Sequence, residues 1–434
     1  MIGALIIFGI AYVAIATEKV DKTAAALLGA SACIIFHLVP YEAALKAVDL
    51  NVIFLLVGMM LAVNVMAATG LFEWLAVTIA RKAKGDGVRI LVMFLAATAV
   101  LSAFLDNVTT VILIAPITVL ICEILEIEAM PILIMEAIAS NVGGAGTLVG
   151  DPPNVLIASS TGLTFIEFLE NLGPPVLIML VVGLPLAAFA MRKRFHVTES
   201  NKARIMRARP ELAILDRKGM QRALAVFGVI LAGFFASHAV GVEPGIIALA
   251  GALLMALVCK TDLHKALEKV EWNSVFFFIG LFMLIGALEH NQVFEKLGHV
   301  ITDWTHGNFL LTVMTILWFS ALLSAIVDNI PLVIAMIPLI QSIIPAFGVE
   351  LGVADDPVAL KHQVAEPLYW ALALGACLGG NGSLVGASAN VVVAQIGRRN
   401  GYPLTFMAFT RLGLPVMIST LLIATGWLYV RYFL

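Results

Sequence analysis

Two copies of one polar motif, each inside an apolar run, constrain the fold of this chain more than any other feature. Residues 101–117 read LSAFLDNVTTVILIAPI, and residues 323–339 read LSAIVDNIPLVIAMIPL. Over the first 16 positions of this pair, 8 residues are identical. An ionised carboxylate near a bilayer centre costs about 3 kcal/mol. An Asp-Asn pair that occurs twice in such surroundings, at 106–107 and 328–329, therefore indicates a selected role.

The duplication continues beyond this motif. The shift of 222 positions that aligns the two Asp-Asn pairs also aligns Gly58 with Gly280. With a shift of 236 positions, GGAGTLVGDPPN (143–154) aligns with GGNGSLVGASAN (379–390), and 7 of these 12 residues match. Self-similarity at a fixed spacing indicates a duplicated architecture. The chain therefore has a first repeat, a linker and a second repeat, at 1–191, 192–222 and 223–434.

The composition indicates a polytopic membrane protein. Of the 434 residues, 61% are hydrophobic and 13% are charged, whereas a soluble domain is about half apolar and about a quarter charged. A span needs about 20 apolar residues, and several segments of the chain are long enough, so we expect an all-α protein that crosses the membrane several times. The apolar N-terminal segment has no basic region before it, so we expect a first span and not a cleaved signal peptide.

The linker sets the expected topology in a cell membrane. It carries 10 of the 26 Lys and Arg residues, and positive loops stay in the cytoplasm. Each repeat crosses the membrane an odd number of times, so the two repeats point oppositely and both termini fall outside. In this arrangement 22 of the 26 basic residues lie inside, and the four others are Lys46, Lys296, Lys361 and Arg431.

One apolar stretch in each repeat is long enough for two spans. These stretches, 89–126 and 308–345, are interrupted by the Asp-Asn pairs. Each can form two spans or one re-entrant hairpin with Asp-Asn at its tip, and the charge pattern fits both. The other spans of the first repeat are expected at 2–16, 23–39, 51–69, 131–158 and 174–191.

Glycine-rich segments interrupt a further span of each repeat, at 140–154 and 379–390. Exposed backbone at membrane depth is tolerated only where it lines a cavity or is buried in protein, and Pro152 and Pro153 cannot continue a helical ladder. Inverted repeats with interrupted helices in matching positions are typical of secondary transporters, whose site lies near the midplane. The transport elements are expected at about 89–160 and 308–396, with the remaining spans as scaffold.

The candidate solute- and ion-binding residues come from the two tips and the two breaks. Carboxylates at the tips suit a proton or Na⁺, and asparagine amides both donate and accept hydrogen bonds. The full set is Asp106, Asn107, Thr109, Thr110, Asn141, Gly143, Gly144, Gly146, Thr147, Asp151, Asn154, Asp328, Asn329, Gly379, Gly380, Asn381, Gly382, Ser383 and Asn390.

Several of these residues have a structural alternative. Asp106 and Asp328 are also suited to cap the helices that follow them, as is Asp151. Glu136, within an apolar segment, fits a buried packing role. Cys377 adjoins the second break, where a thiol is a soft ligand for a metalloid, although the four Cys residues fit the core equally well.

The repeats differ at several of these positions, so the site is expected to be chemically asymmetric. Asp151 aligns with Ala387, and Thr109 aligns with Pro331. The eight His residues show no cluster, so we expect no fixed metal centre and no cofactor. No GxxxxGK[ST] motif occurs, so any ATP drive requires a separate subunit. No basic block interleaved with aromatics points to nucleic acid.

The motifs LSAFLDNVTTVILIAPI, GGAGTLVGDPPN and VDNIPLVIAMIP resemble those of the ion transporter superfamily, which includes ArsB-type arsenite pumps and NhaD-type sodium/proton antiporters. The chain is most similar to the branch that contains the P protein of pigment cells. The resemblance implies ten spans, two re-entrant hairpins, a moving transport domain and often a homodimer. It also implies that the tips and breaks bind solute and ion. The related divalent-anion/sodium symporters have a Ser-Asn-Thr tip where this chain has Asp106-Asn107-Val108.

The expected function is secondary transport and not catalysis. Carboxylates at the tips repel a dianion, so proton-coupled efflux of arsenite or antimonite is the leading hypothesis, by analogy. Sodium/proton antiport is the first alternative, followed by anion or dicarboxylate transport and by an anion channel. An intramembrane aspartic protease also places two carboxylates together, but no accompanying catalytic motif supports it.

Overall fold

The chain is helical throughout its ordered elements in the computed structural model, which describes residues 2–17, 20–195, 197–294 and 307–434. No strand occurs among these residues, which confirms the expected all-α class. Lys296, one of the four basic residues predicted on the side of the termini, lies outside the described residues.

The two repeats have helices at matching positions. Those of the first repeat are α1 (Ile2–Thr17), α2 (Lys22–Ile35), α3 (Tyr41–Lys46), α4 (Leu50–Ala67), α5 (Leu71–Lys82), α6 (Gly87–Phe104), α7 (Asn107–Leu125), α8 (Ala129–Gly144), α9 (Pro152–Thr161) and α10 (Phe165–Met191). The linker contains α11 (Glu199–Arg207) and a short 3₁₀ turn, η1 (Pro210–Ala213). Those of the second repeat are α12 (Arg217–Val240), α13 (Pro244–Val258), α14 (Leu263–Glu268), α15 (Trp272–His290), α17 (Phe309–Ser324), α18 (Asn329–Glu350), α19 (Pro357–Leu360), the π-helix η2 (Lys361–Ala365), α20 (Glu366–Gly379), the 3₁₀ turn η3 (Gly380–Gly382), α21 (Ser388–Arg399) and α22 (Phe406–Tyr432).

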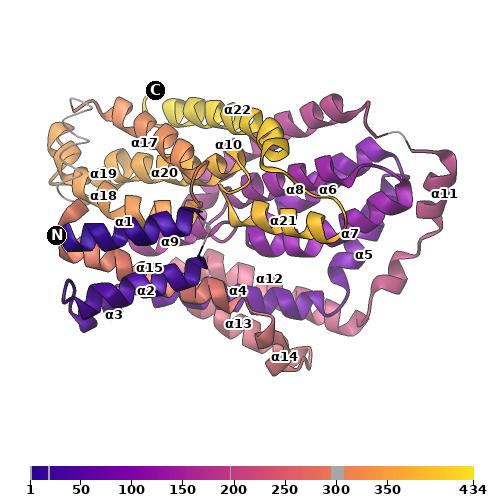
Figure 1. Cartoon of the computed structure of the whole chain (residues 1–434), viewed down its shortest axis with the longest axis horizontal. Helices are drawn as coiled ribbons and strands as arrows, with labels where there is room; N and C mark the ends of the chain where they lie inside the picture. The colour runs from indigo at the N-terminus through magenta and orange to yellow at the C-terminus, as the bar shows by residue number, and fades with distance from the viewer. Residues whose placement is uncertain (1, 18–19, 196, 295–306) are drawn as a thin grey trace.

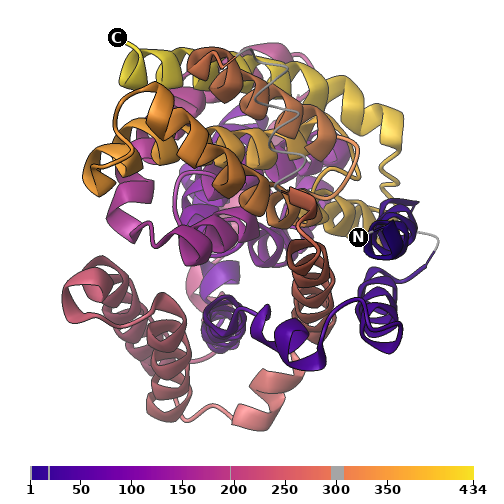
Figure 2. The same cartoon turned by 90° about the vertical axis from the view of Figure 1, so that its left-hand side faces the viewer.

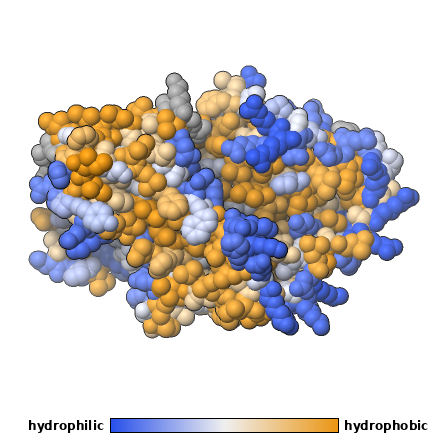
Figure 3. All heavy atoms as spheres, turned by 60° about the horizontal axis from the view of Figure 1, so that its bottom comes forward, coloured by the Kyte–Doolittle hydropathy of each residue, from blue (hydrophilic) through white to orange (hydrophobic). Residues whose placement is uncertain are grey.

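Eight of the described helices are long and apolar enough to cross a membrane: α4, α6, α7, α10, α12, α15, α18 and α22. Shorter apolar helices accompany them, including α1, α2, α13 and α17. Large apolar side chains on the outer face of α10, such as Leu177, Val181 and Phe189, are more than 60% exposed, as expected for a surface that faces lipid. Figure 3 shows apolar surface over much of one face, with hydrophilic side chains gathered at the right-hand end.

The helices form two groups. The first, which we call the crossed layer, contains α1 to α4 and α12 to α15, and the second, the hairpin bundle, contains α6 to α10 and α17 to α22. Figure 2 shows most of the crossed layer below the hairpin bundle. Within the crossed layer α4 packs on α13 and α15 packs on α2, so each repeat supplies one half of each pair.

Glycine permits this close crossing. A Cβ at Gly58 would lie 2.5 Å from the carbonyl carbon of Ala248, and a Cβ at Gly280 would lie 2.8 Å from the backbone nitrogen of Leu27. Real side chains do not tolerate such contacts, so both helices need a residue without Cβ at the crossing point. The two glycines that the sequence aligns therefore have the same structural role.

Each long apolar stretch forms a helical hairpin whose turn is the Asp-Asn pair. The α6–α7 hairpin begins and ends beside the linker, since a Cβ at Gly87 would touch Phe195, and the Asn201 amide donates to the Leu125 carbonyl over 3.2 Å. The α17–α18 hairpin begins and ends at the other end of the molecule, where Phe309 contacts both Phe347 and Phe433. Figure 1 shows α6 and α7 at the right beside α11, α17 and α18 at the left, and both termini toward the left.

Candidate functional site

The same hydrogen bonds attach each hairpin to its glycine break. The Ser102 hydroxyl of α6 donates to the Ser140 carbonyl of α8 over 2.6 Å, and the Ser324 hydroxyl of α17 donates to the Ala376 carbonyl of α20 over 2.6 Å. Both hydroxyls are fully buried. Because the four positions correspond under the two sequence shifts, the repeats share this framework.

Four of the predicted site residues hold the breaks in shape. The Asn154 amide donates to the Thr147 carbonyl over 2.8 Å, and the Asn390 amide donates to the Ser383 carbonyl over 3.0 Å. The hydroxyls of Thr147 and Ser383 donate to carbonyls at the ends of α6 and α17. The break backbone, which has no helical partner, is thereby satisfied inside the protein.

The glycines of the breaks let the backbones approach one another. A Cβ at Gly143 would collide with the Ala99 backbone, and a Cβ at Gly379 would collide with the Ala321 backbone. The remaining predicted glycines also lie within contact distance of neighbouring atoms: Gly144, Gly146, Gly380 and Gly382. A side chain at Gly143, Gly144 or Gly379 would overlap backbone atoms, whereas the nearest atoms at Gly146 lie at 3.3 Å.

The two breaks meet in a buried centre of amides. Asn141, at the end of α8, donates to the side-chain oxygens of Asn381 and Asn390 over 3.0 Å each, and it accepts from Asn107 over 3.1 Å. All four residues are at most 2% exposed. The structure therefore brings together the first tip and both breaks, as the sequence predicted. Cys377, the repeat counterpart of Asn141, contacts the Asn154 oxygen over 3.6 Å.

Asp151 lies at the same centre and contacts the second tip. Its Oδ1 accepts from the Asn329 amide over 3.3 Å, and the Cys377 thiol lies beside the same carboxyl. No nitrogen or oxygen donor of the described residues reaches its Oδ2. Asp151 makes no side-chain cap to α9, so the capping alternative does not describe it. Three further buried polar atoms here have no partner among the described residues: Asn107 Oδ1, Thr110 Oγ1 and Asn381 Nδ2.

The carboxylate of the first tip is hydrogen-bonded within its own helix. Asp106 is the N-cap of α7, and its carboxylate accepts from the Thr109 backbone nitrogen over 2.8 Å and from the Thr109 hydroxyl. The residue is 6% exposed. The capping alternative therefore describes the observed contacts of Asp106, and Thr109 serves as its partner.

The second tip is bound by other elements. Asp328 caps α18 only through the Ile330 nitrogen at 3.3 Å, because the next residue, Pro331, has no N–H. Its Oδ2 accepts instead from the Ser388 hydroxyl of α21 over 2.7 Å and lies 3.5 Å from the Lys22 ammonium of α2. The Lys22 ammonium also donates to Ser388 over 3.1 Å.

A cavity of about 330 Å³ opens beside this second tip. Its polar walls come from α2, from the residue before α15, from the tip and from α21, and they include Asp21, Lys22, Glu271, Asp328 and Ser388. Sequence reasoning missed four of these, Asp21, Lys22, Glu271 and Ser388. The repeat offered two usable signals, since Glu271 aligns with the acidic Asp49 and Asp21 aligns with the acidic Glu243. Lys22 aligns with Pro244 and Ser388 aligns with Pro152, so neither gave a signal.

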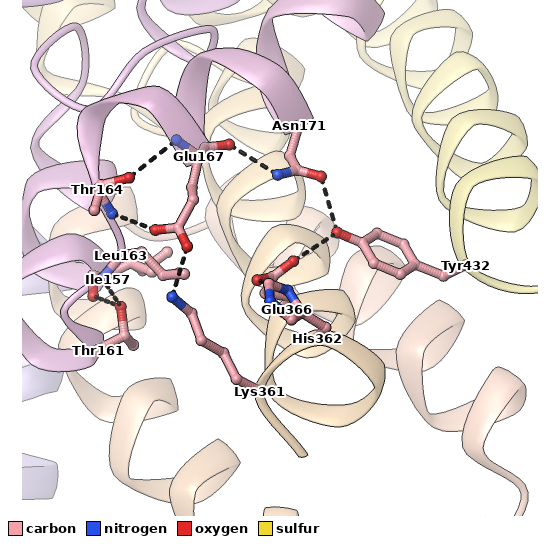
Figure 4. A network of polar contacts seen from close by, with 10 residues as sticks. All are labelled: Ile157, Thr161, Leu163, Thr164, Glu167, Asn171, Lys361, His362, Glu366 and Tyr432. Atoms are coloured by element: carbon pink, nitrogen blue, oxygen red, sulfur yellow. Dashed lines mark hydrogen bonds and ion pairs between the residues drawn. The ribbon is translucent and has the colours of Figure 1, made fainter. Parts of the chain in front are cut away.

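Two other buried acidic positions lie apart from this centre. Glu136 accepts from the Thr118 hydroxyl over 2.6 Å, between α7 and α8. A second cluster joins α10, η2 and α22, where Lys361 contacts Glu167 at 2.6 Å and the Tyr432 hydroxyl contacts Glu366 at 3.3 Å (Figure 4). Among the described residues, no group of three or more His, Cys, Asp or Glu side chains is arranged to hold a metal ion.

Comparisons with known proteins agree with a transporter. The sequence profile of the CitMHS family, described as "Citrate transporter", matches residues 12–361. An uncharacterized transporter of Mycobacterium tuberculosis is 40% identical over 99% of this chain and 98% of its own length. The P protein of Mus musculus is 32% identical over 97% of this chain and 59% of its own length.

A solved structure shares the fold. The YdaH transporter of Alcanivorax borkumensis superimposes with a TM-score of 0.57 over 87% of this chain and 84% of its own, at 14% sequence identity. The family profile and the full-length relatives support the family assignment, whereas the structural similarity to YdaH supports the fold alone. The chain belongs to the CitMHS family of membrane transporters and is not an enzyme.

Proposed function

We propose that the chain is a proton-coupled secondary transporter whose leading cargo is a small uncharged hydroxide such as arsenous or antimonous acid, moved out of the cytoplasm. The observation that carries this proposal is the set of unpaired atoms where the two breaks meet. Asn107 Oδ1 and Asp151 Oδ2 are acceptors, and Asn381 Nδ2 is a donor. Buried polar atoms normally have partners, so this set is suited to a solute whose hydroxyls both donate and accept.

Asp151 is the residue that we assign to the coupling proton. Its side chain is fully buried and one of its oxygens has no partner among the described residues, whereas both oxygens of Asp106 are occupied by Thr109. A proton makes a buried carboxylate neutral, which lowers the cost of its burial, and the O–H that forms can donate to an acceptor. Protonation and solute binding at Asp151 then compete for the same oxygen, which is a direct means of exchange.

Sodium/proton antiport is the second candidate. Three of the four unpaired atoms at this centre, on Asn107, Thr110 and Asp151, are oxygens, and hard cations take oxygen ligands. The family description names citrate, but a free citrate anion would meet the carboxylates of Asp106, Asp151 and Asp328 at the two tips and the first break. Like charges held together at low dielectric repel strongly, so citrate would need a compensating cation.

The packing suggests which parts move. We place α10 and α22 with the hairpin bundle, because they pack against α6, α8, α17 and α20 more than against the crossed layer. The bundle would then slide against the crossed layer as one body, with the linker on the cytoplasmic side and both termini outside. A homodimer, which the resemblance implies, and a separate ATPase subunit, which any ATP drive would require, stay predictions.

A flux assay in proteoliposomes tests the proposal. With a pH-sensitive dye trapped inside, arsenite, antimonite, Na⁺, Li⁺ and citrate are added in turn under an imposed pH gradient. We expect arsenite or antimonite to move protons in the opposite direction and citrate to have no effect. A response to Na⁺ and Li⁺ alone selects the second candidate. Large currents with a linear voltage dependence identify a channel, and movement of citrate alone contradicts both carboxylate-based proposals.

Two variants separate the coupling group from other buried carboxylates. Asp151→Asn keeps the shape and the contact to Asn329 but removes the titrating oxygen, so coupled proton movement is expected to stop. Glu136→Gln, a buried carboxylate on α8 that contacts Thr118 instead of the amide centre, is the matched control and is expected to retain coupling. If Asp151→Asn retains wild-type coupling, Asp151 is not the coupling residue, and Asp106→Asn is then tested in the same assay.

A further inference from the structure

Lys22 joins the crossed layer to the hairpin bundle at the second tip. It is the first residue of α2, and its ammonium lies 3.5 Å from Asp328 Oδ2 and 3.1 Å from the Ser388 hydroxyl. The same ammonium lies over the ring of Phe277, on α15, at 5.1 Å from its centroid. The lysine is therefore held by its own layer through the ring and by the bundle through Asp328 and Ser388.

This contact exists because Asp328 is free to make it. Pro331 occupies the third position of α18 and has no N–H, so it cannot satisfy the carboxylate as Thr109 satisfies Asp106. The Ser388 hydroxyl takes one oxygen at 2.7 Å. The side chains of Lys22 and Asp328 are 35% and 15% exposed, so ions in the adjacent cavity of about 330 Å³ reach both groups.

The lysine contact occurs at the second tip and has no equivalent at the first tip among the described residues. The repeat counterpart of Lys22 is Pro244, and among the described residues Asp106 has no ion pair with a lysine, arginine or histidine. Among the described residues, the charged and titratable groups that act on Asp328 from the surrounding elements are, besides Lys22, mostly acidic. They are Tyr12 of α1, Asp21 before α2, Glu271 before α15 and Asp151 before α9.

We propose that Lys22 is a built-in competitor for a monovalent-cation subsite at Asp328, so that a proton or a small cation such as Na⁺ and the lysine ammonium occupy this carboxylate in turn. When Lys22 holds Asp328, the second tip is tied to α2. When an external cation replaces the ammonium, the tip and the α21 terminus are released from the crossed layer. Cation binding is thereby linked to movement of the bundle, which rests on the transport function proposed above.

The competition follows from charge and geometry. One carboxylate oxygen cannot accept a sodium ion and an ammonium at full strength together, since the two cations repel at that separation. The acidic surroundings attract cations into the cavity, and Lys22 alone among the described residues that line it supplies a fixed positive charge. A ligand with equal affinity for both arrangements does not change their populations. A cation that binds only the lysine-free arrangement raises the population of that arrangement.

A binding assay tests this without any need for transport. The midpoint of thermal unfolding of the purified full-length protein in detergent is measured as Na⁺ replaces choline at pH 8.5, and then as pH falls to 5.5 in choline. Lys22→Gln empties the subsite, so the half-saturating Na⁺ concentration is expected to fall by about tenfold, as for loss of one modest competing interaction. Asp328→Asn is expected to abolish the response, and Lys22→Arg to behave as the wild type.

Lys361→Gln is the matched control, because it removes a partly exposed lysine, 39% exposed, that pairs with Glu167 away from the tips. If Na⁺ has no effect but the acid-induced shift differs between wild type and Lys22→Gln and is lost in Asp328→Asn, the proton is the competing cation. Identical Na⁺ and pH responses in wild type and Lys22→Gln overturn the inference. Should Lys22→Gln not fold, Ser388→Ala weakens the same contact and is expected to shift the response in the same direction. Failure of the flux assay leaves this result intact, so the two proposals fail separately.

Discussion

The two hairpin tips begin from nearly the same sequence and end with different partners. Asp106 is held by Thr109 of its own helix, whereas Asp328 is held by Ser388 and Lys22 from two other elements. The change from Thr109 to Pro331 removes both local donors from the third position of the helix. The distant partners also differ between the repeats, because Ser388 aligns with Pro152 and Lys22 aligns with Pro244.

This difference shows how a duplicated fold acquires an asymmetric site. The framework beneath the tips is the same in both repeats, from the serine contacts to the glycine crossings. The asymmetry lies in the few side chains that the framework presents to the centre. The clearest cases are Asp151, which aligns with Ala387, and Lys22, which aligns with Pro244.

The largest effect is expected where the two regions are equivalent. Gly143→Val and Gly379→Val each drive a side chain into the backbone of the neighbouring hairpin, and we expect a loss of about 4 kcal/mol or more in each. Size-exclusion chromatography of the detergent-solubilised protein is expected to show little folded material for both variants. A folded, stable Gly379→Val beside a misfolded Gly143→Val would show that the frameworks are not equivalent.

Much of this framework was predictable from the sequence, because it depends on local patterns. The duplicated motifs, the interrupted helices and the hairpins follow from glycine, proline and apolar spacing along one chain. The pairing of α4 with α13 and of α2 with α15 was not predictable, since apolar faces of similar composition do not specify their partners. The tips and breaks were identified because they recur. Lys22 was missed because comparison of the repeats selects residues that match, and this lysine has no counterpart in the second repeat.

A smaller effect is expected from making the first tip like the second. Thr109→Pro removes both donors to Asp106 and leaves a buried carboxylate without partners, which we expect to destabilise the protein by about 2 kcal/mol. The midpoint of thermal unfolding measures the loss. The matched variant Thr109→Ser keeps both donors and is expected to retain most of the stability. A wild-type midpoint for Thr109→Pro would mean that Asp106 finds other partners, and that the tips are less different than their contacts indicate.

The reverse change at the second tip is expected to have a modest stabilising effect. Pro331→Thr supplies the missing N–H and a hydroxyl, so Asp328 gains a local cap worth about 1 kcal/mol. The carboxylate should then depend less on the lysine, and Lys22→Gln should change the Na⁺ response less in this background than in the wild type. A double-mutant cycle on the two substitutions measures that coupling. If the effects of the two substitutions on the Na⁺ response are strictly additive, Pro331 does not influence the contact between Lys22 and Asp328.

The smallest effect is expected at the serines that attach the hairpins. Ser102→Ala and Ser324→Ala each delete one hydrogen bond to a helix carbonyl, at 2.6 Å in both repeats, and we expect each to lose about 0.5 kcal/mol. The carbonyls belong to helices α8 and α20, whose own hydrogen bonds persist, which keeps the loss small. Because the surroundings match, the two midpoints of thermal unfolding should fall by similar amounts. A clearly larger loss for Ser324→Ala would mean that the second hairpin, whose tip relies on distant partners, depends more on its anchor than the first.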